Sequence, residues 1–173
     1  MSTLTDAQRA LVGAETSPRP ASYPVNQVMA QFFCEMVEDS NPAYFDEGYA
    51  RSTWLNGTYA PPPMLLIWAM PPVWPAVERE SMIGKLGLEA AGCTATIAVN
   101  AVQEYLRPLR YGDTLTVTNS IASLGDEKTT RLGTGHFVTT LDTYRNQHEQ
   151  VVGTHSFTLF IYAPHAEEEG ART

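Results

Sequence analysis

An apolar segment between two proline runs reads Ala60-Pro61-Pro62-Pro63-Met64-Leu65-Leu66-Ile67-Trp68-Ala69-Met70-Pro71-Pro72, and the predicted fold is built around it. Proline is tolerated at the first position of a helix, because its missing N–H would have no partner there. The seven residues from Met64 to Met70 are all apolar, which predicts a helix that is buried on every side. Pro71 and Pro72 then stop this helix after about two turns.

An amphipathic helix is predicted before this stretch, from Val25 to about Glu38. Its apolar residues recur at helical spacing and are Val25, Val28, Met29, Phe32, Phe33 and Met36. Asp46 to Thr53 is predicted to be a second, short helix, because Asp46 and Glu47 in its first turn interact favourably with the helix dipole.

After Gly92 the composition becomes typical of β-structure. Four segments are rich in Thr, Val, Ile, Phe and Tyr, and they are Thr94–Leu106, Thr114–Ser123, Thr130–Tyr144 and Val151–Tyr162. Short turns separate the last three, which predicts an antiparallel meander. Helices first and strands afterwards indicate an α+β fold, in which an antiparallel sheet wraps around the short buried helix.

The length of 173 residues suits one domain. We expect that domain over residues 25–163. Residues 1–24 are expected to be a loosely held N-terminal lead, with a short polar helix near Thr5 to Val12. Residues 164–173 are expected to be an acidic, flexible tail. The alternative that this tail is a linker to a further domain stays open.

Composition and charge exclude several classes of function. The net charge is −8 and the eleven basic residues are dispersed, which argues against a nucleic-acid-binding surface. The longest apolar stretch is seven residues, whereas a membrane span needs roughly 20. The first ten residues lack a basic start followed by an apolar run, so we expect no secretory signal and a cytoplasmic location.

The cysteines and histidines give no sign of a metal or redox site. Cys34 and Cys93 are too few for a metal site or a disulfide framework, and we expect them to be buried thiols. His136 and His155 lie within predicted strands without a carboxylate at motif spacing, so we expect surface or core roles for both.

Three segments together resemble the MaoC-like (R)-specific enoyl-CoA hydratases of the hot-dog superfamily. They are Glu38–Asp46, with Asp39-Ser40-Asn41-Pro42-Ala43-Tyr44 at its centre, Leu106–Leu115 and Thr140–Gln147. They occur in the family's order, and the resemblance runs from about Val25 to Tyr162. It implies a hot-dog fold and a coenzyme A thioester as substrate, with no further cofactor.

The first departure from the family pattern is in its acid/base pair. In the family, an Asp and a His hold the water that adds to C3 of a 2-enoyl thioester. Here Asp39 occupies the Asp position, but Tyr44 occupies that of the His. A phenol with a reference pKa of about 10 is a poor general base at neutral pH. Asp39 and Asn41 are therefore expected mainly to cap and turn the chain.

The second departure is at the start of the buried helix. There the resemblance assigns a Gly N–H to the thioester oxygen, and Pro63 stands in its place without an N–H. Loss of one such donor costs on the order of 10²–10³ in rate. We therefore expect this chain alone to be inactive.

The proline-rich entry resembles the non-catalytic, N-terminal-type half of two-part MaoC-like hydratases. The resemblance implies a heterodimer or heterotetramer with a partner that carries the Asp and His. A shortened central helix resembles steroid-CoA hydratases, which implies a bulky, steroid side-chain acyl-CoA. Two alternatives stay open. One is a non-enzymatic acyl-CoA-binding or scaffolding module that docks other enzymes. The other is a homodimeric thioesterase that uses Asp39 or Glu38 with water.

Two sets of residues are candidates for binding the substrate. The helix residues Met64, Trp68 and Ala69, together with Trp74, are candidates for lining the acyl cavity, with core packing as the alternative. Arginine binds phosphate through two parallel hydrogen bonds. The basic residues near the strand ends are therefore candidates for contacts to coenzyme A, and they are Arg107, Arg110, Lys128 and Arg131.

Overall fold

The fold was obtained as a computed structural model, which describes residues 4–75 and 80–165. Its centre is an antiparallel sheet in the order β1-β3-β5-β6-β2, with β4 paired to β5. The strands are β1 (Arg19–Pro20), β2 (Ala95–Tyr105), β3 (Thr116–Leu124), β4 (Lys128–Thr129), β5 (Gly133–Arg145) and β6 (Val151–Pro164).

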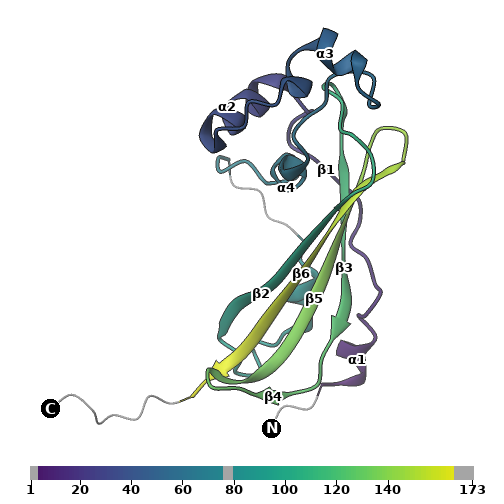
Figure 1. The fold of residues 1–173 in the computed structure, drawn as a ribbon. Coiled ribbons are helices and arrows are strands. Elements are labelled where there is room, and N and C mark those ends of the chain that lie inside the picture. Colours follow the sequence, from purple (N-terminus) through teal and green to yellow (C-terminus); the bar gives the residue numbers. More distant parts are fainter. Residues whose placement is uncertain (1–3, 76–79, 166–173) are drawn as a thin grey trace, which may run out of the picture.

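The described helices are short. They are α1 (Asp6–Arg9), α2 (Gln27–Val37), α3 (Glu47–Ser52), α4 (Leu65–Trp68) and α5 (Met82–Leu86), with 3₁₀ turns η1 (Pro42–Tyr44) and η2 (Pro62–Met64). Figure 1 shows α2, α3 and α4 gathered at one end of the sheet and α1 at the other. Among the described residues, no helix is long and apolar enough to cross a membrane.

The predicted α+β order and the meander are confirmed. Strands β3, β5 and β6 pair in succession, and β2 joins the sheet through β6. Local signals fix the helix ends. The Asn26 side chain accepts a hydrogen bond from the Met29 N–H at 2.9 Å and caps α2, which ends at Glu38 in the left-handed region with φ of 57°. The Asp46 carboxylate caps α3 through the Tyr49 N–H at 2.9 Å.

The central helix is shorter than the sequence predicted. Helix α4 has four residues after the turn η2 and ends at Trp68. Met70, the last residue of the predicted helix, lies beyond it and is 53% exposed. Leu65 and Trp68 are buried, whereas Leu66 and Ile67 are half-buried. The prediction of burial on every side was wrong, because a single sheet covers only one side of the helix.

Two separate apolar cores cover the inner face of the sheet. The first lies under α2 and α4 and consists of Val25, Ala30, Ala60, Met64, Leu65, Trp68, Ala69, Leu109, Leu115, Val117, Tyr144 and Val152. The second lies at the other end of the sheet, around α5, and consists of Leu4, Met82, Leu86, Leu88, Cys93, Ile121, Val138 and Ile161.

The N-terminal lead is held against the sheet, so the expectation of a loose attachment was wrong. Leu4 is 6% exposed and belongs to the second core. The Gly13 N–H donates to the Ile121 carbonyl at 2.9 Å, and the Thr16 N–H donates to the Asn119 carbonyl at 2.9 Å. Most of the expected acidic tail, residues 166–173, lies outside the described residues.

Helix α2 is amphipathic, but the sequence misjudged which of its apolar residues are buried. One side of the helix buries Ala30 and Cys34. Val28, Phe32 and Met36 are 65%, 66% and 75% exposed. These three residues, which we call the open face of α2, follow one another at four-residue spacing and therefore form a continuous stripe.

The close packing of β5 against β6 is tested by adding one methyl group. A Cβ at Gly135 would lie 2.1 Å from the Ile161 carbonyl oxygen and 2.5 Å from the Tyr162 Cα, so backbone would have to move. We expect Gly135→Ala to destabilise the fold by about 1–3 kcal/mol. The melting temperature, measured by circular dichroism, should fall by about 2–4 °C per kcal/mol.

Gly84→Ala is the matched control. This glycine lies within α5, and its nearest contact for an added Cβ is 3.7 Å away, at the Ser81 Cβ. Alanine favours a helix over glycine by about 0.5–1 kcal/mol, so the melting temperature should hold or rise. Equal melting temperatures for Gly135→Ala and the unmodified chain would contradict this packing.

Candidate functional site

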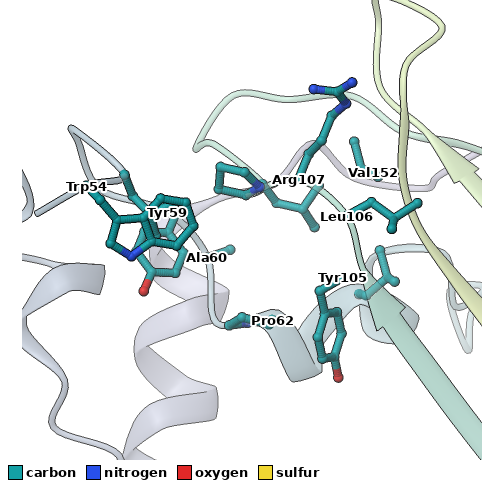
Figure 2. A pocket seen from close by; sticks show the side chains of 12 residues that line it. Trp54, Tyr59, Ala60, Pro62, Tyr105, Leu106, Arg107 and Val152 are labelled. Carbon is teal, nitrogen blue, oxygen red and sulfur yellow. The ribbon is translucent and has the colours of Figure 1, made fainter.

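An apolar pocket of ≈ 250 Å³ lies beside the entrance of the central helix. Its walls come from the segment before the helix, from α4, and from the end of β2 with the segment that follows it. The lining residues are Trp54, Leu55, Tyr59, Ala60, Pro62, Leu65, Tyr105, Leu106, Arg107, Pro108, Leu109 and Val152. Figure 2 shows Tyr105 and Leu106 on one side of this helix-entrance pocket and Trp54 and Tyr59 on the other.

The segments around the pocket are fixed by backbone hydrogen bonds. The Ala60 N–H donates to the Leu109 carbonyl at 2.8 Å, which ties the helix entrance to the chain after β2. The Leu106 N–H and the Arg107 N–H both donate to the Val152 carbonyl, at 2.9 and 3.1 Å. The pocket is therefore preformed, although Trp54 on its wall is 91% exposed.

The helix entrance itself has no N–H to offer a ligand. Pro61, Pro62 and Pro63 lack an N–H altogether. The next two donors are used within the turn, because the Met64 N–H donates to the Pro61 carbonyl at 3.0 Å and the Leu65 N–H to the Pro62 carbonyl. This segment cannot stabilise the negative charge of a thioester oxygen through its backbone.

The polar residues of the Asp39–Tyr44 segment serve to turn the chain. The Asp39 carboxylate accepts from the Asn41 N–H at 3.0 Å, and the Asn41 side chain accepts from the Ala43 N–H at 3.1 Å and caps η1. These bonds are the capping role that the sequence analysis assigned to both residues.

Tyr44 packs in an aromatic cluster. It is 6% exposed, and its ring makes edge contacts with Tyr59 at 5.3 Å and with Phe45 at 6.1 Å between centroids. Burial, and after it the nearby Asp39 carboxylate, raise the pKa of the Tyr44 hydroxyl, while a hydrogen bond with Asn41 works in the opposite direction. A raised pKa makes this phenol an even poorer general base at neutral pH.

Three of the four candidates for lining the acyl cavity lie together, and the fourth does not. Met64, Trp68 and Ala69 are at most 5% exposed and belong to the first core. Trp74 is 85% exposed. The indole N–H of Trp68 is buried and has no hydrogen-bond partner among the described residues.

The four basic candidates also divide into two pairs. Arg107 and Arg110 follow β2. The last residue of β2, Tyr105, pairs with Gly153 on β6, which in turn pairs with Tyr144 on β5. Lys128 pairs with Gly135, nine residues away along β5, and Arg131 follows in the next turn. At about 3.3 Å per residue the pairs are roughly 30 Å apart.

Of these four basic residues, Arg107 lines the helix-entrance pocket. Arg107 is exposed, and Figure 2 shows its guanidinium pointing away from the pocket interior. The Arg110 guanidinium instead donates to the carbonyls of Gly57 at 2.5 Å, Thr58 at 2.9 Å and Leu55, so it holds the loop after α3. Lys128 lies 6.0 Å over the Phe137 ring.

The cysteines are buried, as the sequence analysis expected, and burial raises the pKa of both thiols. His136 is 1% exposed, and its Nδ1 lies 3.0 Å from the Gly125 carbonyl, which is a core role. His155 is also buried, at 7% exposed, and it has a carboxylate neighbour that spacing along the sequence does not reveal. Its Nδ1 lies 3.7 Å from Asp142 Oδ2, because these residues face each other across β5 and β6.

Several residues of the helix-entrance pocket were not identified as site residues from the sequence. Tyr59 immediately precedes the proline run, and Tyr105 and Leu106 immediately precede Arg107, which had been singled out. Their position next to the proline run and to Arg107 could have identified these three residues as site candidates. Val152 carried no such signal, because it reaches the pocket from β6 through strand pairing.

Comparison with known proteins places this geometry in a family. Residues 10–155 match the family described as "FAS1-like, dehydratase domain region". A probable enoyl-CoA hydratase alpha subunit from Thermomonospora curvata is 35% identical over 157 residues, which cover 88% of this chain and 49% of that protein. The 3-oxo-4,17-pregnadiene-20-carboxyl-CoA hydratase alpha subunit of Mycobacterium tuberculosis is 30% identical over 144 residues, which cover 80% and 46%.

Solved structures share the fold. The structure of the ChsH1-ChsH2 complex from Mycobacterium tuberculosis contains a chain with a TM-score of 0.83 and 26% identity, over 94% of this chain and 93% of that one. A MaoC-like dehydratase from Rhodospirillum rubrum has a TM-score of 0.59 at 16% identity, over 87% and 93%, which supports the fold alone.

The chain spans about half the length of the curated relatives it matches. The expected hot-dog fold and the resemblance to MaoC-like hydratases are confirmed by these matches. The family match covers most of the sequence, and the chain therefore belongs to the FAS1-like dehydratase-region family, with a MaoC-like hot-dog fold.

Proposed function

We propose that this chain is the non-catalytic, substrate-binding subunit of a heteromeric MaoC-like 2-enoyl-CoA hydratase. The observation that carries the proposal is the helix entrance, where three consecutive prolines and two internally bonded N–H groups leave no donor for a thioester oxygen. Tyr44, buried among aromatic rings with a raised pKa, does not replace the missing base. A partner chain must then supply the chemistry.

The names of the relatives support a hydratase with unlike subunits. The two curated relatives described above are named as alpha subunits of CoA-ester hydratases, and the structural neighbour with a TM-score of 0.83 is part of a two-protein complex. A thioesterase is less well supported, because it would need an oxyanion donor at the same helix entrance. A purely scaffolding module differs from the proposed subunit in one measurable respect, which is whether the complex hydrates an enoyl-CoA.

We further propose that the acyl group is bulky, of the size of a steroid side-chain ester. Among the described residues, helix α4 ends at Trp68 and the next helix begins at Met82, and a cavity of ≈ 250 Å³ lies between Arg19, Ile83 and the strands β3 and β5. One of the relatives is named for a pregnadiene-carboxyl-CoA. In this proposal coenzyme A enters as part of the substrate, with Arg107 as the basic residue nearest the helix-entrance pocket.

The partner is proposed to cover two exposed apolar surfaces. One is the open face of α2. The other is β2, an eleven-residue strand at the end of the sheet order, whose Ile97, Val99 and Val102 are 38%, 50% and 47% exposed. A long edge strand without lysine or proline invites pairing with another chain. Together these surfaces favour an obligate interface over a free monomer.

The first prediction concerns activity. The purified chain should not hydrate crotonyl-CoA, and activity should appear on co-expression with a partner that carries the family's Asp and His. Within the complex, Tyr44→Phe should keep kcat within about twofold, since a general base contributes about 10²–10⁴ and this phenol contributes none. The decrease of absorbance of the conjugated thioester gives the rate.

Alanine at the partner's motif His is the matched control, and it should lower kcat by about 10²–10⁴. A hundredfold loss with Tyr44→Phe in a folded complex would contradict the non-catalytic assignment. Turnover by the isolated chain, at a rate that copurified contaminants cannot explain, would contradict it as well.

The second prediction concerns assembly. Phe32→Glu places a charge on the open face of α2, where burial against a partner would desolvate it without an ion pair. We expect this variant to lose co-purification with the tagged partner. The control is Leu132→Glu, because Leu132 is also a partly exposed apolar residue, 39%, but lies between β4 and β5 at the other end of the sheet.

Leu132→Glu should leave co-purification unchanged. Retention of the partner by Phe32→Glu, with the same elution volume as the unmodified complex, would rule out the open face of α2 as an interface.

A further inference from the structure

The inner face of the sheet is apolar at both ends and polar in the middle. On β5, Tyr144 belongs to the first core and Val138 to the second, and both point to the helix side of the sheet. Because side chains alternate along a strand, Thr140 and Asp142 point to the same side. The polar residues therefore lie between the two apolar cores.

Strand register extends this polar interval across the whole sheet. Asn119 on β3 pairs with Asp142 on β5, Asp142 pairs with His155 on β6, and His155 pairs with Gln103 on β2. We call these four residues the polar row. With strands about 4.8 Å apart, the row is roughly 15 Å wide.

The polar row is only partly satisfied by its own hydrogen bonds. The Asn119 amide donates to Asp142 Oδ1 at 2.7 Å. His155 is 7% exposed, and its buried Nδ1 has no hydrogen-bond partner among the described residues. The 3.7 Å from this nitrogen to Asp142 Oδ2 is beyond hydrogen-bond reach. The imidazole is held in place by stacking on Phe157, at 5.6 Å between ring centroids.

A cavity of ≈ 250 Å³ opens onto the β3 and β5 part of the row. Asn119, Thr140 and Asp142 line it from the sheet, together with Arg19 and with Glu80, Ser81 and Ile83 at the start of α5. The Arg19 guanidinium donates to the Ala69 carbonyl at 3.1 Å, directly after α4 ends. The cavity therefore begins where the central helix stops.

An all-hydrocarbon ligand is a poor match for this surface. Laid over the row, it would exclude water from the Asp142 carboxylate without offering it a hydrogen bond in return, and it would leave the His155 Nδ1 without a partner as before. An oxygen substituent avoids that cost, because a hydroxyl can donate to Asp142 and either a hydroxyl or a ketone can accept from a donor such as Arg19.

We propose that the polar row binds an oxygen substituent, a hydroxyl or a ketone, on the distal rings of a bulky acyl group. The inference rests on the proposed function, since it takes the acyl group to extend inward from the helix-entrance pocket while the partner supplies the donor for the thioester oxygen. From Pro62 to Trp68 the chain rises by about 10 Å, at roughly 1.5 Å per residue. A four-carbon acyl group, with bonds of about 1.5 Å, ends short of the row.

The test compares three matched 2-enoyl-CoA esters on the complex with its partner. All carry the same polycyclic acyl group, with a distal ring ketone, a distal ring hydroxyl, or CH₂ at that position. Both kcat/KM for hydration and Kd by calorimetry are measured, with crotonyl-CoA as the short reference. The unmodified complex should favour an oxygenated ester over the CH₂ ester by at least about tenfold, since sites built around hydrogen bonds reject analogues that lack them.

Two variants remove polar groups of the row by different routes. His155→Phe keeps the stacking surface on Phe157, and Asp142→Leu removes the carboxylate. Each should reduce the preference to less than about threefold and leave crotonyl-CoA within about twofold. Thr154→Val is the matched control, because Thr154 neighbours His155 on β6 but points to the opposite face. It should keep the preference.

The outcomes separate this inference from the proposed function. Equal kcat/KM and Kd for all three esters would overturn the polar-row site even if crotonyl-CoA is hydrated. A preference that survives in both His155→Phe and Asp142→Leu would also overturn it. Tighter binding of an oxygenated ester, lost in the variants, by a complex that hydrates nothing would support the row and refute the hydratase assignment.

Discussion

The proline residues on both sides of the central helix constrain the rest of the structure. Pro61–Pro63 and Pro71-Pro72 limit the helical segment Pro62–Trp68 to about 10 Å, whereas the thirteen residues of β5 extend over roughly 40 Å. One helix of that length cannot cover the inner face of the sheet. The second core, built from Leu4, α5 and the far ends of the strands, covers the other end, and the polar row lies between them.

The same prolines connect the shape of the cavity with the loss of chemistry. A residue that must present its N–H to a thioester oxygen cannot be proline. Once a partner supplies that donor, the entrance is free to accept Pro61, Pro62 and Pro63, which rigidify it and hold the helix-entrance pocket open beside Leu109. In the proposed subunit, binding and catalysis are thus divided between two chains.

Sequence alone predicted the elements of this fold well and their surroundings less well. Hydrophobic periodicity located α2, but it cannot distinguish a buried face, with Ala30 and Cys34, from one left open, with Val28 and Phe32. The strand segments were visible from composition, yet the pairing of Asp142 with His155 depends on long-range register. Local chemistry did predict the turn formed by Asp39 and Asn41, because those hydrogen bonds span only two residues.

The segment that resembles the family's catalytic motif illustrates how a site can keep its shape without its reaction. Asp39 and Asn41 still fold the chain after α2, and the Tyr111 hydroxyl donates to the Tyr44 carbonyl at 2.9 Å. Burial raises the pKa of Tyr111 to about 12, so this hydroxyl stays a proton donor across the physiological range. The polar groups of the segment are occupied in holding the backbone, and Tyr44 fills the core with its ring. The retained motif therefore explains the local fold, while the capacity for recognition lies elsewhere, on the inner face of the sheet.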